Sequence, residues 1–162
     1  MNTVEIANTL ATLFVELTEG APEVGGYMLN GSDQGLLRSL DRVSAGDASA
    51  LTSSGSSIAA HTDHLRYGLS LMNRSSAGEN PFEDADWSAS WRRTVVAERD
   101  WQQLRADLRT EISRWLDALR KPREVNDKEL SGMIGSIAHL AYHLGAIRQI
   151  NQATRGPVET TK

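Results

Sequence analysis

Residues 97–120 read AERDWQQLRADLRTEISRWLDALR, and this stretch decides the fold class. Its large apolar side chains recur at intervals of three and four residues: Trp101, Leu104, Leu108, Ile112, Trp115 and Leu119. That spacing places them all on one side of an α-helix, whereas in a strand it would scatter them over both faces. The stretch therefore predicts a long helix that contributes one apolar stripe to a bundle.

The remainder of the chain shows the same helical period. We expect further helices over 3–18, 33–43, 58 to about 73, and 127 to about 153. Ser56 or Ser57 is a suitable N-cap for the third of these, and Asp127 for the last. By composition, residues 44–57 and 74–86 are expected to be loops. With no convincing strand in the sequence, the prediction is an all-α, up-down four-helix bundle with one or two short extra helices.

Length and composition set limits on the kind of protein. With 162 residues we expect one domain over residues 1–155 and a flexible tail over 156–162. The hydrophobic share of 40% and the charged share of 23% are ordinary for a soluble globular protein. The chain has no cysteine, which excludes disulfides, thiolate metal sites and cysteine nucleophiles. Any bound metal must therefore be held by nitrogen and oxygen atoms.

Charge and hydropathy bear on partners and location. The net charge is −4, and the arginines of residues 92–120 are interleaved with acidic residues instead of forming a basic cluster. Nucleic-acid binding is therefore not expected. The N-terminal stretch MNTVEIANTL does not have the pattern of a signal peptide. No apolar run approaches the ~20 residues that a membrane span needs. We expect a cytoplasmic protein without a membrane partner.

The four histidines fall on two of the predicted helices. His139 and His143 are four residues apart, so they lie one turn apart on one face. Joined by a third imidazole from another helix, such a pair can hold a divalent metal and leave coordination positions open for substrate. His61 and His64 are both candidates for the third ligand, and periodicity does not decide between them. The alternative is that the histidines only pack at the edge of the core.

Neighbouring residues leave further alternatives open. Leu140 stands where the zinc proteases of the H-E-x-x-H type have glutamate, so their mechanism is excluded. Asp63 precedes His64 and is expected on the solvated surface, with a role as acceptor or general base as the alternative. Arg148 is either a binding group for an anionic substrate or a surface cation.

Two segments, SIAAHTDHL (57–65) and AHLAYHLGAIRQI (138–150), resemble the two halves of the signature of the DinB-like superfamily. The similarity consists of a Ser-Ile pair with His64 six residues after the isoleucine, and of the later H-x-x-x-H followed by Gly145. The stretch DWSASWRRTVVAERDWQQL (86–104) is similar to the connection before the third long helix of that family. The sequence departs from the family at Ala146, where glutamine is common.

The resemblance implies a DinB-like four-helix bundle that is a metal-dependent hydrolase or thiol S-transferase. It implies a divalent metal, zinc, nickel or similar, held by His64, His139 and His143, together with a small-molecule substrate. A transferase of this kind would use a low-molecular-weight thiol, and such proteins often form homodimers. The rival interpretation is a non-catalytic bundle that binds metal or a small molecule. The residues themselves do not indicate which side chains would be catalytic.

Overall fold

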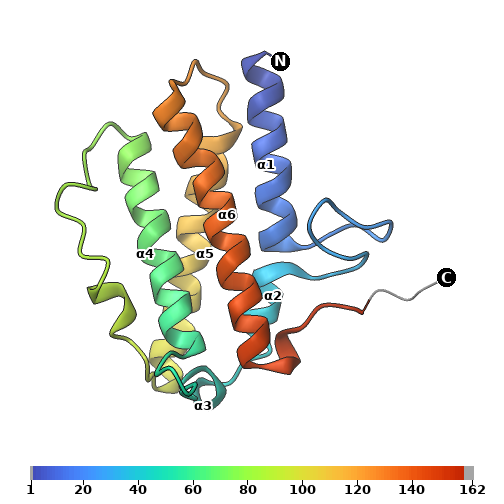
Figure 1. Ribbon diagram of the computed structural model, residues 1–162, viewed down its shortest axis with the longest axis vertical. Coiled ribbons are helices and arrows are strands. Elements are labelled where there is room, and N and C mark those ends of the chain that lie inside the picture. Colours follow the sequence, from blue (N-terminus) through green and yellow to red (C-terminus); the bar gives the residue numbers. More distant parts are fainter. Residues whose placement is uncertain (1, 159–162) are drawn as a thin grey trace. The chain divides into compact units, whose positions relative to one another are not determined.

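A computed structural model describes residues 2–158 of the chain (Figure 1). In this range the chain is all-helical and has no strand, which confirms the all-α prediction. The elements, in order, are α1 (Thr3–Glu19), α2 (Gly35–Asp41), α3 (Ala45–Ala48), α4 (Ile58–Ser76), η1 (Ala89–Trp91), α5 (Glu98–Arg120), α6 (Asp127–Ile150) and η2 (Gln152–Thr154). The two η elements are single turns of 3-10 helix.

Local capping explains where the helices begin. Ser57 is the N-cap of α4, because its hydroxyl accepts a hydrogen bond from the backbone N–H of Ala60. The prediction that Asp127 caps the last helix is wrong by one residue: Asn126 is the cap and forms a capping box with Glu129. The predicted loop 44–57 contains the short helix α3, which begins because Ser44 accepts from the backbone N–H of Asp47.

The chain divides into two compact units. Unit 1 comprises the residues up to Arg42 and those from Leu119 onwards, and unit 2 is Val43–Ala118. Unit 1 contains α1, α2, α6 and η2, whereas unit 2 contains α3, α4, η1 and nearly all of α5.

In unit 1, α1 packs against both α2 and α6 (Figure 1). The buried apolar side chains of these helices include Phe14, Leu17, Leu36, Leu40, Leu140, Leu144 and Ile147. The loop after α1 is fixed by the buried carboxylate of Glu16, which accepts hydrogen bonds from the backbone N–H groups of Tyr27, Met28 and Leu29 at 3.0, 2.6 and 2.7 Å. A single α1 side chain therefore sets the course of this loop.

The end of α6 is tied to the same loop by a buried ion pair. Arg148 Nη2 lies 2.6 Å from Asp33 Oδ1, and the two side chains are 15% and 3% exposed. Arg148 is therefore the ion-pair partner of Asp33 and not an unpaired surface cation. Asn30 Nδ2 donates to the carbonyl of Pro157 at 3.0 Å, which anchors the start of the predicted tail 156–162. Residues 159–162 of that tail lie outside the described residues.

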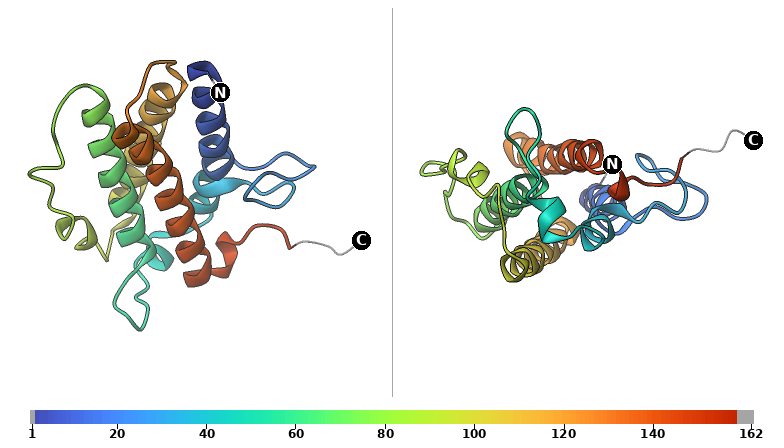
Figure 2. Two further views of the ribbon diagram at one scale, coloured as in Figure 1. Left: turned by 45° about the horizontal axis from the view of Figure 1, so that its top comes forward. Right: turned by 90° about the horizontal axis from the view of Figure 1, so that it is seen from below.

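In unit 2, side-chain hydrogen bonds join α5 to α4 and to the segment before α3. Asn73 Nδ2 donates to the carbonyl and to Oε2 of Glu111, at 3.0 and 2.7 Å. The buried Trp101 donates from Nε1 to the carbonyl of Val43 at 2.8 Å. Figure 2 shows η1 and the loop before it beside α4, and η1 and α4 are in contact. This contact positions the Trp87–Trp91 segment.

By length and composition alone, one helix of the described chain, α6, could cross a membrane. A single helix of this kind is weak evidence for a span, because the core helix of a soluble protein passes the same test. The buried face of α6 carries Leu140, Leu144 and Ile147, as expected of a core helix.

Alanine at Gly20 is expected to destabilise the protein by about 2–3 kcal/mol. Gly20 has φ +114°, and a Cβ there would lie 2.1 Å from the carbonyl oxygen of Asp33. Gly55→Ala is the matched control, because Gly55 also has positive φ (+81°) but nothing lies within 4 Å of its Cβ position. Urea denaturation followed by circular dichroism measures both. Equal losses of stability would show that the close approach of Gly20 to Asp33 contributes nothing.

Candidate metal centre

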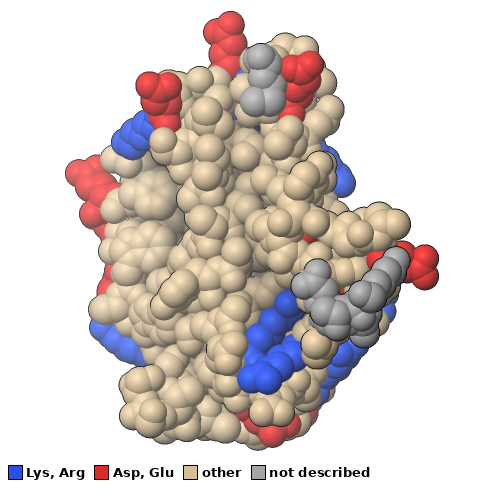
Figure 3. Space-filling view, turned by 45° about the vertical axis from the view of Figure 1, so that its right-hand side comes forward, with Lys and Arg blue, Asp and Glu red and all other residues tan. Residues whose placement is uncertain are grey.

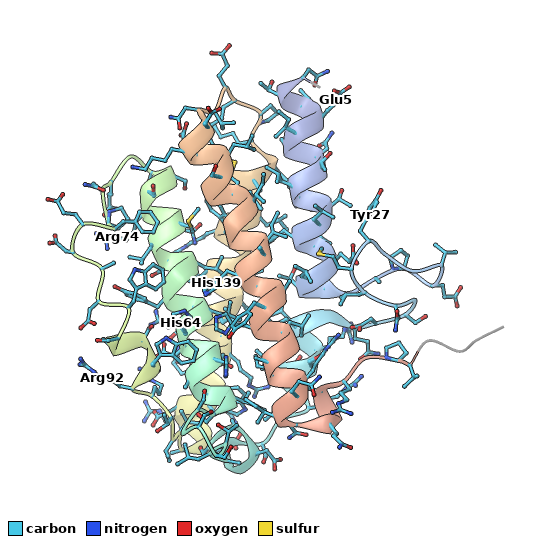
Figure 4. All side chains as sticks on the ribbon, in the orientation of Figure 1. Glu5, Tyr27, His64, Arg74, Arg92 and His139 are labelled. Atoms are coloured by element: carbon cyan, nitrogen blue, oxygen red, sulfur yellow. The ribbon has the colours of Figure 1, made fainter. Side chains whose placement is uncertain are left out.

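His139 and His143 form a close pair in unit 1. Their Nε2 atoms are 2.9 Å apart, and their rings meet edge to face with centroids 4.4 Å apart. Figure 4 shows His139 about halfway along α6. The i,i+4 prediction is thus confirmed: the two imidazoles lie on one face of α6, at the edge of its buried stripe. His143 is buried and His139 is half-buried.

The two Nε2 atoms lie close to the separation that a shared divalent ion requires. As neutral imidazoles 2.9 Å apart, they can share one N–H in a hydrogen bond. Two nitrogens on one tetrahedral zinc ion would lie about 3.3 Å apart, because each Zn–N distance is about 2.0–2.1 Å. A small rotation of the side chains closes this difference. His139 and His143 therefore fit as two ligands of one metal ion.

Burial favours the neutral form in which His139 would bind a metal. Desolvation lowers the pKa of His139 below its ordinary value of 6.5. Because a protonated imidazole has no lone pair for a metal, a lowered pKa keeps His139 ready to bind at mildly acidic pH. The ring of Tyr142 contacts that of His143 edge-on, with centroids 5.0 Å apart. Tyr142 is nevertheless 69% exposed, so it lies at the surface and not in the core.

His64 contacts Ser90 and Trp91 of η1 in unit 2. Its Nδ1 lies 2.7 Å from the hydroxyl of Ser90 in η1, and its ring stacks on Trp91 with centroids 4.3 Å apart at 26°. The side chain projects from α4 (Figure 4) and is buried. Ser90 was not predicted from the sequence, because one serine in a polar segment carries no periodic signal. With Nδ1 bonded to Ser90, Nε2 is the nitrogen that would serve as metal ligand.

His61 and Asp63 occupy the same part of α4. His61 is as buried as His64 and meets Trp91 edge-on, with ring centroids 5.1 Å apart at 83°. The expectation that Asp63 is solvated is wrong. Its carboxylate is buried and pairs with Arg66 at 2.8 Å and Arg93 at 3.5 Å. Asp63 therefore pairs with two arginines of unit 2.

No protein-family model matches this chain, and neither does any curated protein or solved structure. The resemblance to the DinB-like superfamily therefore rests on the sequence of segments 57–65, 86–104 and 138–150.

In the absence of metal, the stability of the protein should fall as the pH drops below about 6.5. Burial lowers the pKa of His61, so the unfolded chain binds a proton at a higher pH than the folded protein does. The contribution of neutral His61 to stability is thus complete above the unfolded pKa and is lost on acidification. His61→Gln should flatten this dependence, as measured by urea denaturation in chelator between pH 8 and 5. An unchanged slope in the variant would contradict the assignment.

Proposed function

We propose that this protein is a metal-dependent enzyme with a DinB-like four-helix bundle, in which His64, His139 and His143 hold one divalent ion. The observation that carries the proposal is the 2.9 Å approach of the Nε2 atoms of His139 and His143. Their helix and its i,i+4 spacing follow from the sequence, and His64 is the histidine that the sequence resemblance pairs with them.

The chemistry of the three side chains supports this ligand set. Each offers one ring nitrogen; His64 and His143 are buried, and His139 is half-buried. Three imidazoles without thiolates suit zinc, nickel or a similar ion. Three protein ligands leave coordination positions open, as in catalytic sites, whereas structural sites are closed by four.

The proposed reaction is hydrolysis or the transfer of a low-molecular-weight thiol to an electrophilic substrate. A bound divalent ion would lower the pKa of the water or thiol that it binds. The histidines of this chain would hold the ion in their neutral forms, and the stacking of Trp91 on His64 would keep bulk water from that ring. A thiol would have to come from a small molecule, because the chain has no cysteine.

A cytoplasmic location, a homodimer, a small-molecule substrate, and the absence of nucleic-acid and membrane partners belong to the same proposal. On the face shown in Figure 3, basic side chains gather in one area at the lower right and the other charged groups are dispersed. The net charge of −4 and the interleaving of arginines with acidic residues over 92–120 support the absence of a nucleic-acid partner.

One observation favours the alternative of a non-catalytic bundle. His139 and His143 are hydrogen-bonded to each other, so each of the two Nε2 atoms has a partner without a metal.

Metal analysis of untagged protein that has been purified without a nickel column tests the proposed site. A panel of ester substrates and of thiol–electrophile pairs then tests catalysis. We expect turnover that a chelator abolishes and added metal restores. Stoichiometric metal without such turnover would support the non-catalytic alternative.

Metal affinity should fall steeply as the pH drops from about 7 to about 5, because up to three protons compete with the ion for the ligands. Because burial lowers the pKa of His139, its neutral, metal-binding form persists below pH 6.5. Titration of metal release against pH measures the effect. A site built from surface carboxylates would instead retain metal to about pH 4. Unchanged affinity at pH 5 would therefore exclude the three-histidine site.

A further inference from the structure

The hydroxyl of Ser90 makes two short contacts within unit 2. Ser90 Oγ lies 2.7 Å from the carbonyl oxygen of Trp87 and 2.7 Å from Nδ1 of His64. Both Ser90 and His64 are buried, at 5% and 7% exposure, so water does not readily replace either contact.

Counting protons decides the direction of both hydrogen bonds. A carbonyl oxygen only accepts, so the bond between Ser90 and Trp87 takes the single hydroxyl proton of Ser90. The remaining contact of the hydroxyl, with His64, then has to be made through its lone pairs. His64 Nδ1 must therefore donate, and the neutral imidazole carries its proton on Nδ1 and its lone pair on Nε2. The opposite assignment would leave the oxygens of Ser90 and Trp87 facing each other at 2.7 Å without a proton between them.

We propose that Ser90 is a positioning residue that fixes His64 in the Nδ1–H tautomer and thereby presents Nε2 as the metal-binding atom. This inference rests on the proposed function insofar as it takes His64 as a ligand. The carbonyl of Trp87 completes the relay, because it orients the hydroxyl so that the lone pairs of Ser90 face the ring. Metal-ligating histidines commonly pass their second N–H to such an acceptor.

Stacking restricts the one motion that a hydrogen bond at Nδ1 leaves open. The ring of His64 lies against Trp91 at 4.3 Å, and its centroid is 5.6 Å from that of Trp87. Rotation about the Nδ1–Oγ direction would break the stacking on Trp91. Three residues of one short segment, Trp87, Ser90 and Trp91, therefore fix both the proton and the plane of this imidazole.

The tautomer is measured on the full-length, metal-free protein by ¹⁵N NMR of the histidine ring nitrogens above pH 7.5. His64 is identified by its absence from the spectrum of His64→Gln. In the wild type we expect the protonated nitrogen of His64 to be Nδ1. In Ser90→Ala we expect population of the Nε2–H form, which free neutral histidine prefers, and in Ser90→Thr retention of Nδ1–H. Ser88→Ala is the matched control, since the Ser88 side chain is exposed and its hydroxyl donates to Asp86, away from His64.

Zinc affinity provides the second readout. Ser90→Ala should weaken zinc binding about 10- to 100-fold, the usual cost of removing such an acceptor, while Ser88→Ala should not change it. Two results would overturn the role of Ser90. One is an Nε2–H tautomer of His64 in the wild type. The other is a wild type that binds zinc together with a Ser90→Ala variant that binds it equally tightly. A wild-type protein that binds no zinc at all would overturn the proposed function, and the wild-type tautomer would still decide the inference. The wild-type NMR measurement does not depend on whether the variants fold.

Discussion

Alanine in place of His64, His139 or His143 is expected to lower zinc affinity by at least an order of magnitude. Removing the hydrogen-bond acceptor of a metal-ligating histidine already lowers metal affinity about 10- to 100-fold. Removing the histidine itself would also remove a direct bond to the ion. His139 and His143 should behave alike, because their Nε2 atoms converge within 2.9 Å. Competition titration against a chromophoric chelator measures the affinities, and circular dichroism confirms that each variant is folded.

His61→Ala is the matched control for this series. His61 lies on α4 three residues before His64, is equally buried and meets the same tryptophan, so its removal disturbs packing to a similar degree. Its zinc affinity should remain within about threefold of the wild type, because a residue outside the ligand shell costs less than one inside it. Equal losses for His61→Ala and His64→Ala would mean that the two histidines of α4 have been assigned incorrectly.

Methionine in place of Arg148 is expected to reduce the free energy of unfolding by about 3–5 kcal/mol, the cost of leaving one partner of a buried ion pair alone. The side chain of Asp33 is 3% exposed. Gly156 packs so closely beside its Oδ2 that a Cβ added to the glycine would lie 1.9 Å from that atom. Without Arg148 the carboxylate would keep the backbone N–H of Gly35 as a donor but would lose its counter-charge. Urea denaturation followed by circular dichroism measures the loss.

Two controls separate the buried pair from arginine loss in general. Arg74→Met removes an equally short ion pair with Glu79, at 2.7 Å, but these side chains are 54% and 52% exposed. It should therefore cost no more than about 1 kcal/mol. Adding Asp33→Asn to Arg148→Met should recover part of the stability, because the uncompensated charge is removed. An Arg148→Met variant as stable as Arg74→Met would show that the pair does not hold the loop after α1 to α6.

The sequence by itself determined the features that depend on near neighbours in the chain. The spacing from Trp101 to Leu119 predicted α5, and all six of those side chains are buried. The i,i+4 interval predicted that His139 and His143 share a face, since 3.6 residues per turn brings them together whatever else packs nearby. Errors occurred where several polar residues compete for one cap. Asn126 rather than Asp127 begins α6, and Ser44 starts a helix in a segment whose composition indicates a loop.

Only the tertiary structure decided the contacts between residues that are far apart in sequence. Ser90 meets His64 across 26 residues, and Asp33 meets Arg148 across 115. Neither contact can be predicted from the periodicity of the sequence, because a hydrogen bond or an ion pair needs only one suitable side chain at each end. Periodicity likewise could not separate His61 from His64, since both are buried on α4. Only the folded chain brings the Ser90 hydroxyl of η1 to Nδ1 of His64, the contact from which we infer the tautomer of that ring.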